Sequence, residues 1–209
     1  MSSIRSKLDN IWYHYKSYII VGIFLLGTLI VCLHSCVTKP EFDIYVYYVT
    51  GDIPVYKEQL SLIESAVAEH CGDVNGDGEI NVAITNVKIG TGTSATERAE
   101  AMNLVNAGTV MLFFGDKAGI NYLYQNSYIQ SLRPYTEDLP EQEYAWKVSG
   151  SPFAKSVEGW SDLFSDTEIY MALRVFDGTW ASAMGSVKKN FRVAETTLTS
   201  IISVAPSED

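Results

Sequence analysis

The sequence FDIYVYYV, residues 42–49, decides how most of the chain is organised. Its Tyr, Val and Ile content is typical of a buried β-strand. An apolar stripe with helical spacing follows at residues 56–71, and a second β-rich run covers residues 80–89. Ser94 and Glu97 have the spacing of a capping box, which predicts a helix that runs to about residue 106. The alternation of strand and helix predicts parallel pairing with right-handed crossovers.

The later part of the chain continues this pattern and then departs from it. TVMLFF, residues 109–114, reads as a strand covered on both faces, and Gly115-Asp116 caps a third helix. From Pro134 onward the pattern changes to an acidic loop, two expected strands (146–149 and 168–176) and a final helix within 183–204. The predicted fold class is α/β, with a mostly parallel twisted sheet and helices on both faces.

A second stretch predicts where the protein is located. YIIVGIFLLGTLIVCLHSCV, residues 18–37, contains no Asp, Glu, Lys or Arg, and such a run is long enough to span a bilayer as a helix. Three basic residues and one acid precede it, so the positive-inside rule predicts a cytoplasmic N-terminus and an extracytoplasmic C-terminal part. We therefore expect a cytoplasmic segment (1–17), a transmembrane helix (18–37), a tether (38–41), an extracytoplasmic α/β domain (42–204) and a tail (205–209).

Two other interpretations of this stretch stay open. It could be a cleaved signal peptide, although the segment before it is long and contains Asp9. Leu33-His34-Ser35-Cys36 also approximates a lipoprotein processing box, with Cys36 as the lipidated residue. Each alternative still exports the part of the chain that follows.

Composition narrows the classes of partner. The chain after residue 37 has 12 Lys and Arg against 24 Asp and Glu. Such an acidic domain argues against nucleic acid or anionic lipid as a partner. Of the three cysteines only Cys71 follows the apolar stretch, so no disulfide framework is expected.

The order of elements from residue 43 to residue 135 is similar to the first lobe of type II periplasmic-type solute-binding proteins. The residues that carry the resemblance are TVMLFFGDKAGINYLYQNSYIQSLRPY, 109–135, where an apolar strand enters a short helix and leaves through an LRPY-like exit. The resemblance implies a single solute-binding-like lobe, because the chain is short for a complete second lobe. The anchored arrangement also resembles that of membrane proteins of Gram-positive bacteria.

One short motif suggests metal chemistry. DVNGDGEIN, residues 73–81, resembles an EF-hand loop and especially the DxNxDGxIN repeat of dockerin modules. Position twelve, which needs a bidentate acid, is Ile84, so the sequence predicts at most a weak, structural Ca²⁺ site. A plain solvated turn explains the same residues equally well. The expected ligands are Asp73, Asn75, Asp77, Glu79 and Asn81.

Ligands of an open parallel sheet bind beyond the carboxyl ends of its strands. The residues expected there, which could hold a small polar solute, are Thr50, Asp52, Thr91, Thr93, Ser94 and Asp116. Ordinary turn and cap roles are the alternative. The sequence has no GxSxG motif, so we expect a non-enzymatic interaction or solute-binding module beside a neighbouring membrane protein. The alternatives are a lipoprotein-like solute receptor working with a transporter and a cell-surface hydrolase.

Overall fold

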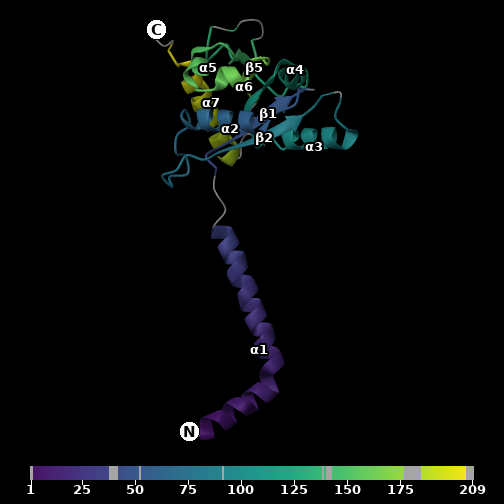
Figure 1. The fold of residues 1–209 in the computed structure, drawn as a ribbon, viewed down its shortest axis with the longest axis vertical. Coiled ribbons are helices and arrows are strands. Elements are labelled where there is room, and N and C mark those ends of the chain that lie inside the picture. Colours follow the sequence, from purple (N-terminus) through teal and green to yellow (C-terminus); the bar gives the residue numbers. More distant parts are fainter. Residues whose placement is uncertain are drawn as a thin grey trace. The chain divides into compact units, whose positions relative to one another are not determined.

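A computed structural model of the chain describes residues 2–37, 42–51, 53–90, 92–137, 139, 143–176 and 185–205 (Figure 1). The chain divides into two compact units, Met1–Glu41 and Phe42–Asp209, and each is described by itself. The expected tether at 38–41 and positions 206–209 of the expected tail lie outside the described residues.

The first unit contains one long helix, α1 (Ser2–Val37). Its segment Tyr15–Cys32 has a mean hydropathy of 1.9, and none of this segment is buried. The helix is therefore long and apolar enough to cross a membrane, as the sequence predicted.

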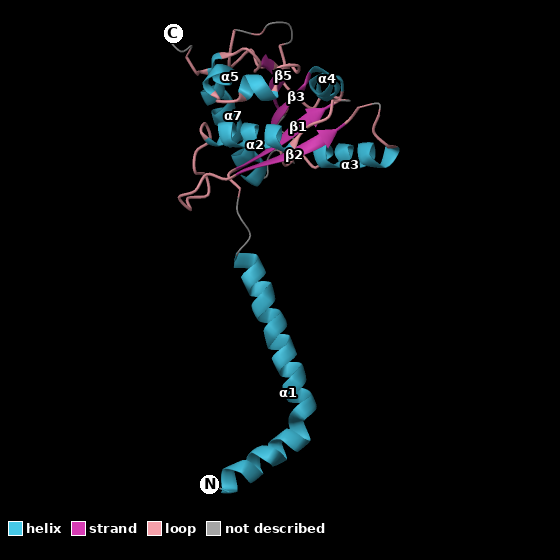
Figure 2. Cartoon of the chain, viewed as in Figure 1, coloured by secondary structure: helices cyan, strands magenta, loops and turns pink. Residues whose placement is uncertain are grey.

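The second unit is built on a five-stranded sheet with the strand order β2-β1-β3-β5-β4 (Figure 2). The first three strands are parallel, whereas β5 runs antiparallel to both of its neighbours, β3 and β4. The strands are β1 (Ile44–Thr50), β2 (Val82–Lys88), β3 (Leu112–Asp116), β4 (Trp146–Lys147) and β5 (Ile169–Leu173).

The prediction of a mostly parallel sheet was wrong, because the sheet is mixed. A parallel pair needs a crossover that carries the chain back along the length of the sheet. Between β4 and β5 the chain forms only α5 (Pro152–Ser156) and α6 (Trp160–Leu163). These two helices are too short to carry the chain back along the sheet. β5 therefore starts at the end of the sheet where β4 finishes, and it runs in the opposite direction.

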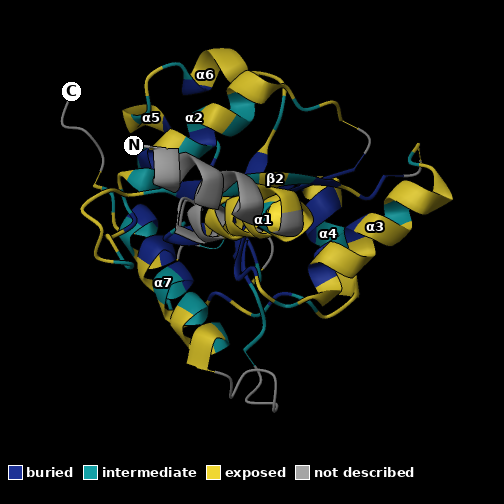
Figure 3. Ribbon diagram, turned by 90° about the horizontal axis from the view of Figure 1, so that it is seen from below, coloured by how far each residue is buried: buried dark blue, intermediate teal, exposed yellow. Residues whose placement is uncertain are grey.

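Helices cover both faces of the sheet, and this part of the prediction is confirmed. Val46 and Tyr48 of β1 belong to one apolar core, with residues of α2 and α7. Tyr47 and Val49, which alternate with them, belong to a second core with residues of α3 and α4. Figure 3 shows the buried residues on the inner sides of these helices. The helices are α2 (Lys57–Ala68), α3 (Ala95–Asn106), α4 (Lys117–Gln125) and α7 (Gly185–Ile202).

Local signals in the sequence set the ends of several elements. The Ser94 hydroxyl accepts a hydrogen bond from the Glu97 backbone N–H, and the Ser94 N–H donates to the Glu97 carboxylate at 2.9 Å. This is the expected capping box. Gly108, just beyond the end of α3, has a φ of +69°, which favours glycine there.

The end of β3 and the start of α4 both approach the backbone at the end of β1 unusually closely. A Cβ atom added to Gly115 would lie 2.2 Å from the Val49 carbonyl oxygen, and one added to Gly119 would lie 2.1 Å from the same atom. Only hydrogen atoms fit in these gaps. The two glycines therefore let α4 pack directly on the backbone of β1 and bring the carboxyl ends of β1 and β3 together.

Candidate functional site

The order in which strands are added to the sheet reverses between β1 and β3, so the carboxyl ends of these two strands form a switch point. β2 lies on one side of β1 and β3 lies on the other, so the helical connections leave in opposite directions. In open α/β sheets this switch point is the usual place for a ligand. The structure brings two residues of the predicted site, Thr50 and Asp116, to this place.

Asp116 uses its carboxylate to hold the switch point together. One oxygen accepts hydrogen bonds from the N–H groups of Gly119 (2.7 Å) and Gly51 (3.2 Å), and the other accepts from Gly51 at 3.0 Å. Asp116 is 3% exposed, and Thr50 is 1% exposed with its hydroxyl 3.4 Å from the Asn86 side-chain oxygen. Burial and the nearby charge of Asp116 also raise the pKa of the Tyr48 phenol. Both predicted residues are therefore buried and form hydrogen bonds within the domain, which is a structural role.

The other predicted ligand-binding residues belong to the connection between β2 and α3. The Thr93 hydroxyl donates to the Gly90 carbonyl at 2.5 Å, and Ser94 caps α3. Neither residue lines the surface depressions at the switch point. Asp52 and Thr91 lie outside the described residues.

An open groove lies at the switch point, and we call it the switch-point groove. It consists of two depressions of about 310 and 380 Å³ that share Ile53, Asp166 and Thr167. The β1–α2 connection and the start of α2 (53–59), the first turn of α4 (116–118) and the segment before β5 (162–168) form its walls. Sequence reasoning missed the last of these segments, because nothing in its residues shows that β5 begins beside the end of β3.

Gln59 ties two walls of the groove together. Its side-chain oxygen accepts from the Tyr56 N–H at 3.0 Å, and its amide nitrogen donates to the Leu163 carbonyl at 2.7 Å. Large apolar side chains nevertheless remain open to solvent on both sides of this link. Ile53 is 42% exposed, Tyr56 62% and Leu163 37%.

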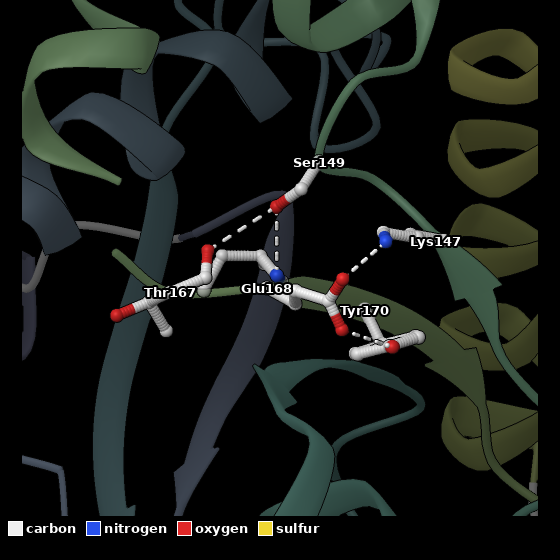
Figure 4. A network of polar contacts seen from close by, with 6 residues as sticks. Lys147, Ser149, Thr167, Glu168 and Tyr170 are labelled. Carbon is white, nitrogen blue, oxygen red and sulfur yellow. Dashed lines mark hydrogen bonds and ion pairs between the residues drawn. The ribbon is translucent and has the colours of Figure 1, made fainter. Parts of the chain in front are cut away.

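Glu168 lies at the end of the groove in a polar network that Figure 4 shows. One carboxylate oxygen pairs with the Lys147 ammonium, and the other accepts from the Tyr170 hydroxyl at 2.9 Å. These hydrogen bonds lower the pKa of Glu168. The neighbouring Ser149 hydroxyl accepts from the Ile169 N–H at 2.8 Å and donates to the Thr167 carbonyl at 3.3 Å, which fixes the start of β5.

The loop with the EF-hand-like sequence has the backbone arrangement that such a sequence favours. The two carboxylate oxygens of Asp73 accept from the Gly76 and Gly78 N–H groups at 2.6 and 2.9 Å. The side chains of Asn75 and Asp77 each accept from the N–H two residues later, at 2.9 and 2.8 Å. Among the described residues, no three His, Cys, Asp or Glu side chains gather as a metal-binding group. Any cation here would also need Asn75 and the Glu79 carbonyl.

Asp43, which sequence reasoning did not single out, holds this loop onto the sheet. Its carboxylate accepts from the N–H groups of Val74 (2.7 Å), Asn75 (3.0 Å) and Asn81 (2.8 Å). Asn81, an expected ligand, thus contributes a backbone donor to Asp43. Burial raises the pKa of Asp43, but the three hydrogen bonds and the charge of Lys189 outweigh it, so the pKa falls below its usual value.

This lowered pKa predicts a pH-dependent contribution to stability. Because the pKa of Asp43 is lower in the folded chain than in the unfolded chain, the contribution is complete above about pH 4 and is lost as the pH falls further. We expect Asp43→Asn to destabilise the domain by about 1–3 kcal/mol near neutral pH. Thermal unfolding of both proteins across the acid range should show this difference shrinking below about pH 4. A difference that stays constant with pH would exclude this role.

His70 and Ser200 form the other pair of chemical interest. His70 Nδ1 lies 3.0 Å from the Ser200 hydroxyl oxygen, and the ring packs edge-on against Phe153. Burial lowers the pKa of His70. Ser200 is inside α7, where backbone N–H groups bond within the helix and are not free to stabilise an oxyanion. We therefore give the pair a packing role.

Comparisons with protein-family models, with curated proteins and with solved structures give no match for this chain.

Proposed function

We propose that the protein is a non-enzymatic, membrane-anchored interaction domain that presents the switch-point groove to a neighbouring membrane protein on the extracytoplasmic side. One observation carries the proposal: the Asp116 carboxylate and the Gly51 and Gly119 N–H groups at the switch point bond to one another, while the apolar side chains of Ile53, Tyr56 and Leu163 stay exposed. A solute receptor needs convergent free polar groups in a concave site, whereas exposed apolar side chains with a polar rim are typical of protein interfaces.

The charge of the groove indicates the chemistry of the partner. Glu58, Asp162 and Asp166 line it together with Lys117, whereas the charge of Glu168 is already paired with Lys147. Complementary charge favours the encounter of two surfaces and fixes their register. The partner segment should therefore combine basic side chains with apolar ones that cover Tyr56 and Leu163.

A photo-crosslinking experiment on intact cells tests both the location and the surface. Tyr56→Cys, in the full-length protein with Cys32 and Cys36 replaced by serine, is labelled with a membrane-impermeant maleimide that carries a photo-crosslinker. We expect labelling and, after illumination, one discrete adduct with a membrane protein. Asp166→Lys in the same background should reduce that adduct about tenfold, as expected when a charge contact of about 1.4 kcal/mol is lost.

The controls separate the parts of the proposal. Tyr124→Cys places the crosslinker on α4 at a comparably exposed tyrosine, 51% exposed, away from the groove, and should not give the adduct. Glu100→Lys makes the same charge change on α3 and should leave the Tyr56 adduct intact. No labelling on intact cells would refute the extracytoplasmic location. Labelling without an adduct specific to Tyr56 would refute the interaction surface.

We further propose that the loop at 73–81 binds Ca²⁺ weakly and structurally. Side-chain oxygens of Asp73, Asn75 and Asp77 and the Glu79 carbonyl supply the expected ligands. The side-chain hydrogen bonds within the loop support this, because they already hold it in a tight turn. Ile84 lies in β2 and supplies no carboxylate, so the affinity should be in the millimolar range.

Calcium should therefore raise the thermal stability of the protein. At a concentration ten times the dissociation constant, a single site contributes about 1.4 kcal/mol, or about 3–5 °C in the unfolding midpoint. Asp77→Asn should remove this response while it keeps an oxygen that can accept from the Glu79 N–H. Mg²⁺ at the same concentration is the control for ionic strength. Equal shifts with both ions, or a response that survives Asp77→Asn, would show that the loop is a plain turn.

A further inference from the structure

The two edge strands of the sheet differ in how well they are protected (Figure 2). β4, at one edge, has two residues, and one of them, Lys147, is charged. Short edge strands and charged side chains keep a sheet from pairing with another chain. β2, at the other edge, has seven residues in unbroken register with β1, contains no proline, and carries its single charge, Lys88, at its last position. β2 is therefore a long edge strand without the usual protection.

The backbone of β2 alternates between the neighbouring strand and the open edge. The N–H of Ile89, one residue beyond β2, donates to the Thr50 carbonyl of β1 at 2.9 Å. In a parallel ladder the N–H and C=O of one residue point to the same side, and successive residues alternate. The odd-numbered residues of β2 therefore bond to β1, and the even-numbered residues direct their N–H and C=O groups to the open edge.

The open part of this edge is its middle. Val82, at the start of β2, is 3% exposed, and the Gly90 carbonyl beyond its end accepts from the Arg98 guanidinium at 2.9 Å. The even-numbered residues between these two positions are half-buried or exposed, and they are Ile84, Asn86 and Lys88. In the described part of the chain their outward N–H and C=O groups have no hydrogen-bond partner. Three successive outward residues are thus available to a further strand.

A second copy of β2 fits this edge without opposing like charges. Rotation by half a turn about an axis at Asn86 places Asn86 opposite Asn86 and Ile84 opposite Lys88. In this antiparallel register each of the three outward residues exchanges N–H···O=C bonds with its counterpart. Like charges directly opposite each other destabilise a strand pair, and here each Lys88 faces a neutral side chain. The chain has a net charge of −10, which makes two copies repel each other, but β2 contains no acidic residue.

We propose that two copies of this chain pair through their β2 strands, antiparallel and with a two-fold axis at Asn86, so that the two five-stranded sheets become one. The shared edge contains no residue that lines the switch-point groove, so the dimer goes beyond the function proposed above. A common membrane favours the contact further, because copies anchored in one bilayer meet at a high effective concentration.

Resonance energy transfer between copies in a bilayer tests the dimer. The full-length protein is fused at its C-terminus to a donor or an acceptor fluorescent protein, and the two fusions are reconstituted together into phosphatidylcholine vesicles. We expect energy transfer that saturates as the protein density rises and that falls when unlabelled protein is added. Transfer that grows only linearly with density reflects random proximity and overturns the proposal.

Proline at the centre of the edge separates pairing from folding. The Asn86 N–H points away from β1, so Asn86→Pro removes no bond of the ladder within one copy, and proline is tolerated at such edge positions. Between two copies it removes both central donors, so the dissociation constant of the dimer should rise at least about tenfold. Asn86→Thr is the matched control, because it loses the same side-chain oxygen near Thr50 but keeps the backbone N–H. This variant should dimerise like the wild type.

Charged variants test the register. Asn86→Lys and Asn86→Asp each place like charges opposite each other in their own dimers and should weaken pairing about threefold. Donor-labelled Asn86→Lys mixed with acceptor-labelled Asn86→Asp brings unlike charges together and should pair more tightly than either variant alone. This comparison decides the question even if Asn86→Pro does not fold. Pairing that a folded Asn86→Pro leaves unchanged, or a mixture of the two charged variants that pairs no better than its components, overturns the proposal.

Discussion

Gly119→Ala should destabilise the α/β domain by about 3 kcal/mol, in the upper range for an overpacked site. The change would normally favour a helix by about 1 kcal/mol, because glycine is the poorer helix former. Here the new methyl carbon would lie 2.1 Å from the Val49 carbonyl oxygen and 2.6 Å from its carbon. Both are backbone atoms of a central strand, so relief requires α4 to move away from β1. Thermal unfolding, followed by near-ultraviolet circular dichroism, measures the loss.

Gly185→Ala is the matched control for this prediction. Gly185 is the first residue of α7, and a Cβ added there meets no atom of the described residues within 4 Å. This substitution should be neutral or slightly stabilising. If the two alanine variants unfold at the same temperature, the close approach of α4 and β1 does not exist in the protein.

Asp116→Ala should cost about 3 kcal/mol, or roughly 6–12 °C in the unfolding midpoint. The substitution leaves the N–H groups of Gly51 and Gly119 without their acceptor at a place where Asp116 is 3% exposed. Each unsatisfied buried donor costs about 1–3 kcal/mol. Asp116→Asn keeps one acceptor oxygen and should lose about half as much. The midpoint of thermal unfolding checks both values.

Asp166→Asn provides the comparison for Asp116. It removes a carboxylate charge from an exposed position of the same groove, and surface changes of this kind usually stay within about 0.5 kcal/mol. A large loss at Asp166, or none at Asp116, would mean that the hydrogen bonds to Asp116 do not hold the switch point. The first outcome would also indicate that groove charge, and not the buried contact, controls stability.

The parts of the fold that depend on neighbours in sequence were predictable. The Ser94 capping box joins residues three positions apart, and Gly108 follows the helix that it ends. The strand centred on Tyr47 was equally clear, because its composition fits burial on both faces. The strand at residues 109–114 was placed slightly early, since Thr109 to Met111 are apolar enough to extend the pattern but precede the ladder of β3.

The direction of β5 and the walls of the groove were not predictable in the same way. Antiparallel pairing of Met171 with Phe114 depends on where the chain goes between residues 117 and 168, and local preference does not determine that path. The groove was not predictable for the same reason, because its segment 162–168 lies beside Asp116 only as a result of this strand pairing. The role of Asp43 was not predicted for a related reason, because its three hydrogen-bond donors belong to residues more than thirty positions away.

The position of α7 has a consequence for how the chain is made. Ala194, Leu198 and Ile201 of α7 complete the core that also contains Val46, Leu112 and Met171. Because synthesis proceeds from the N-terminus, every strand of the sheet leaves the ribosome before α7, which covers this face together with α2. For that interval a broad apolar surface stays open on a chain whose first helix is already available to a membrane. The domain can therefore complete this core only after α7 has been synthesised.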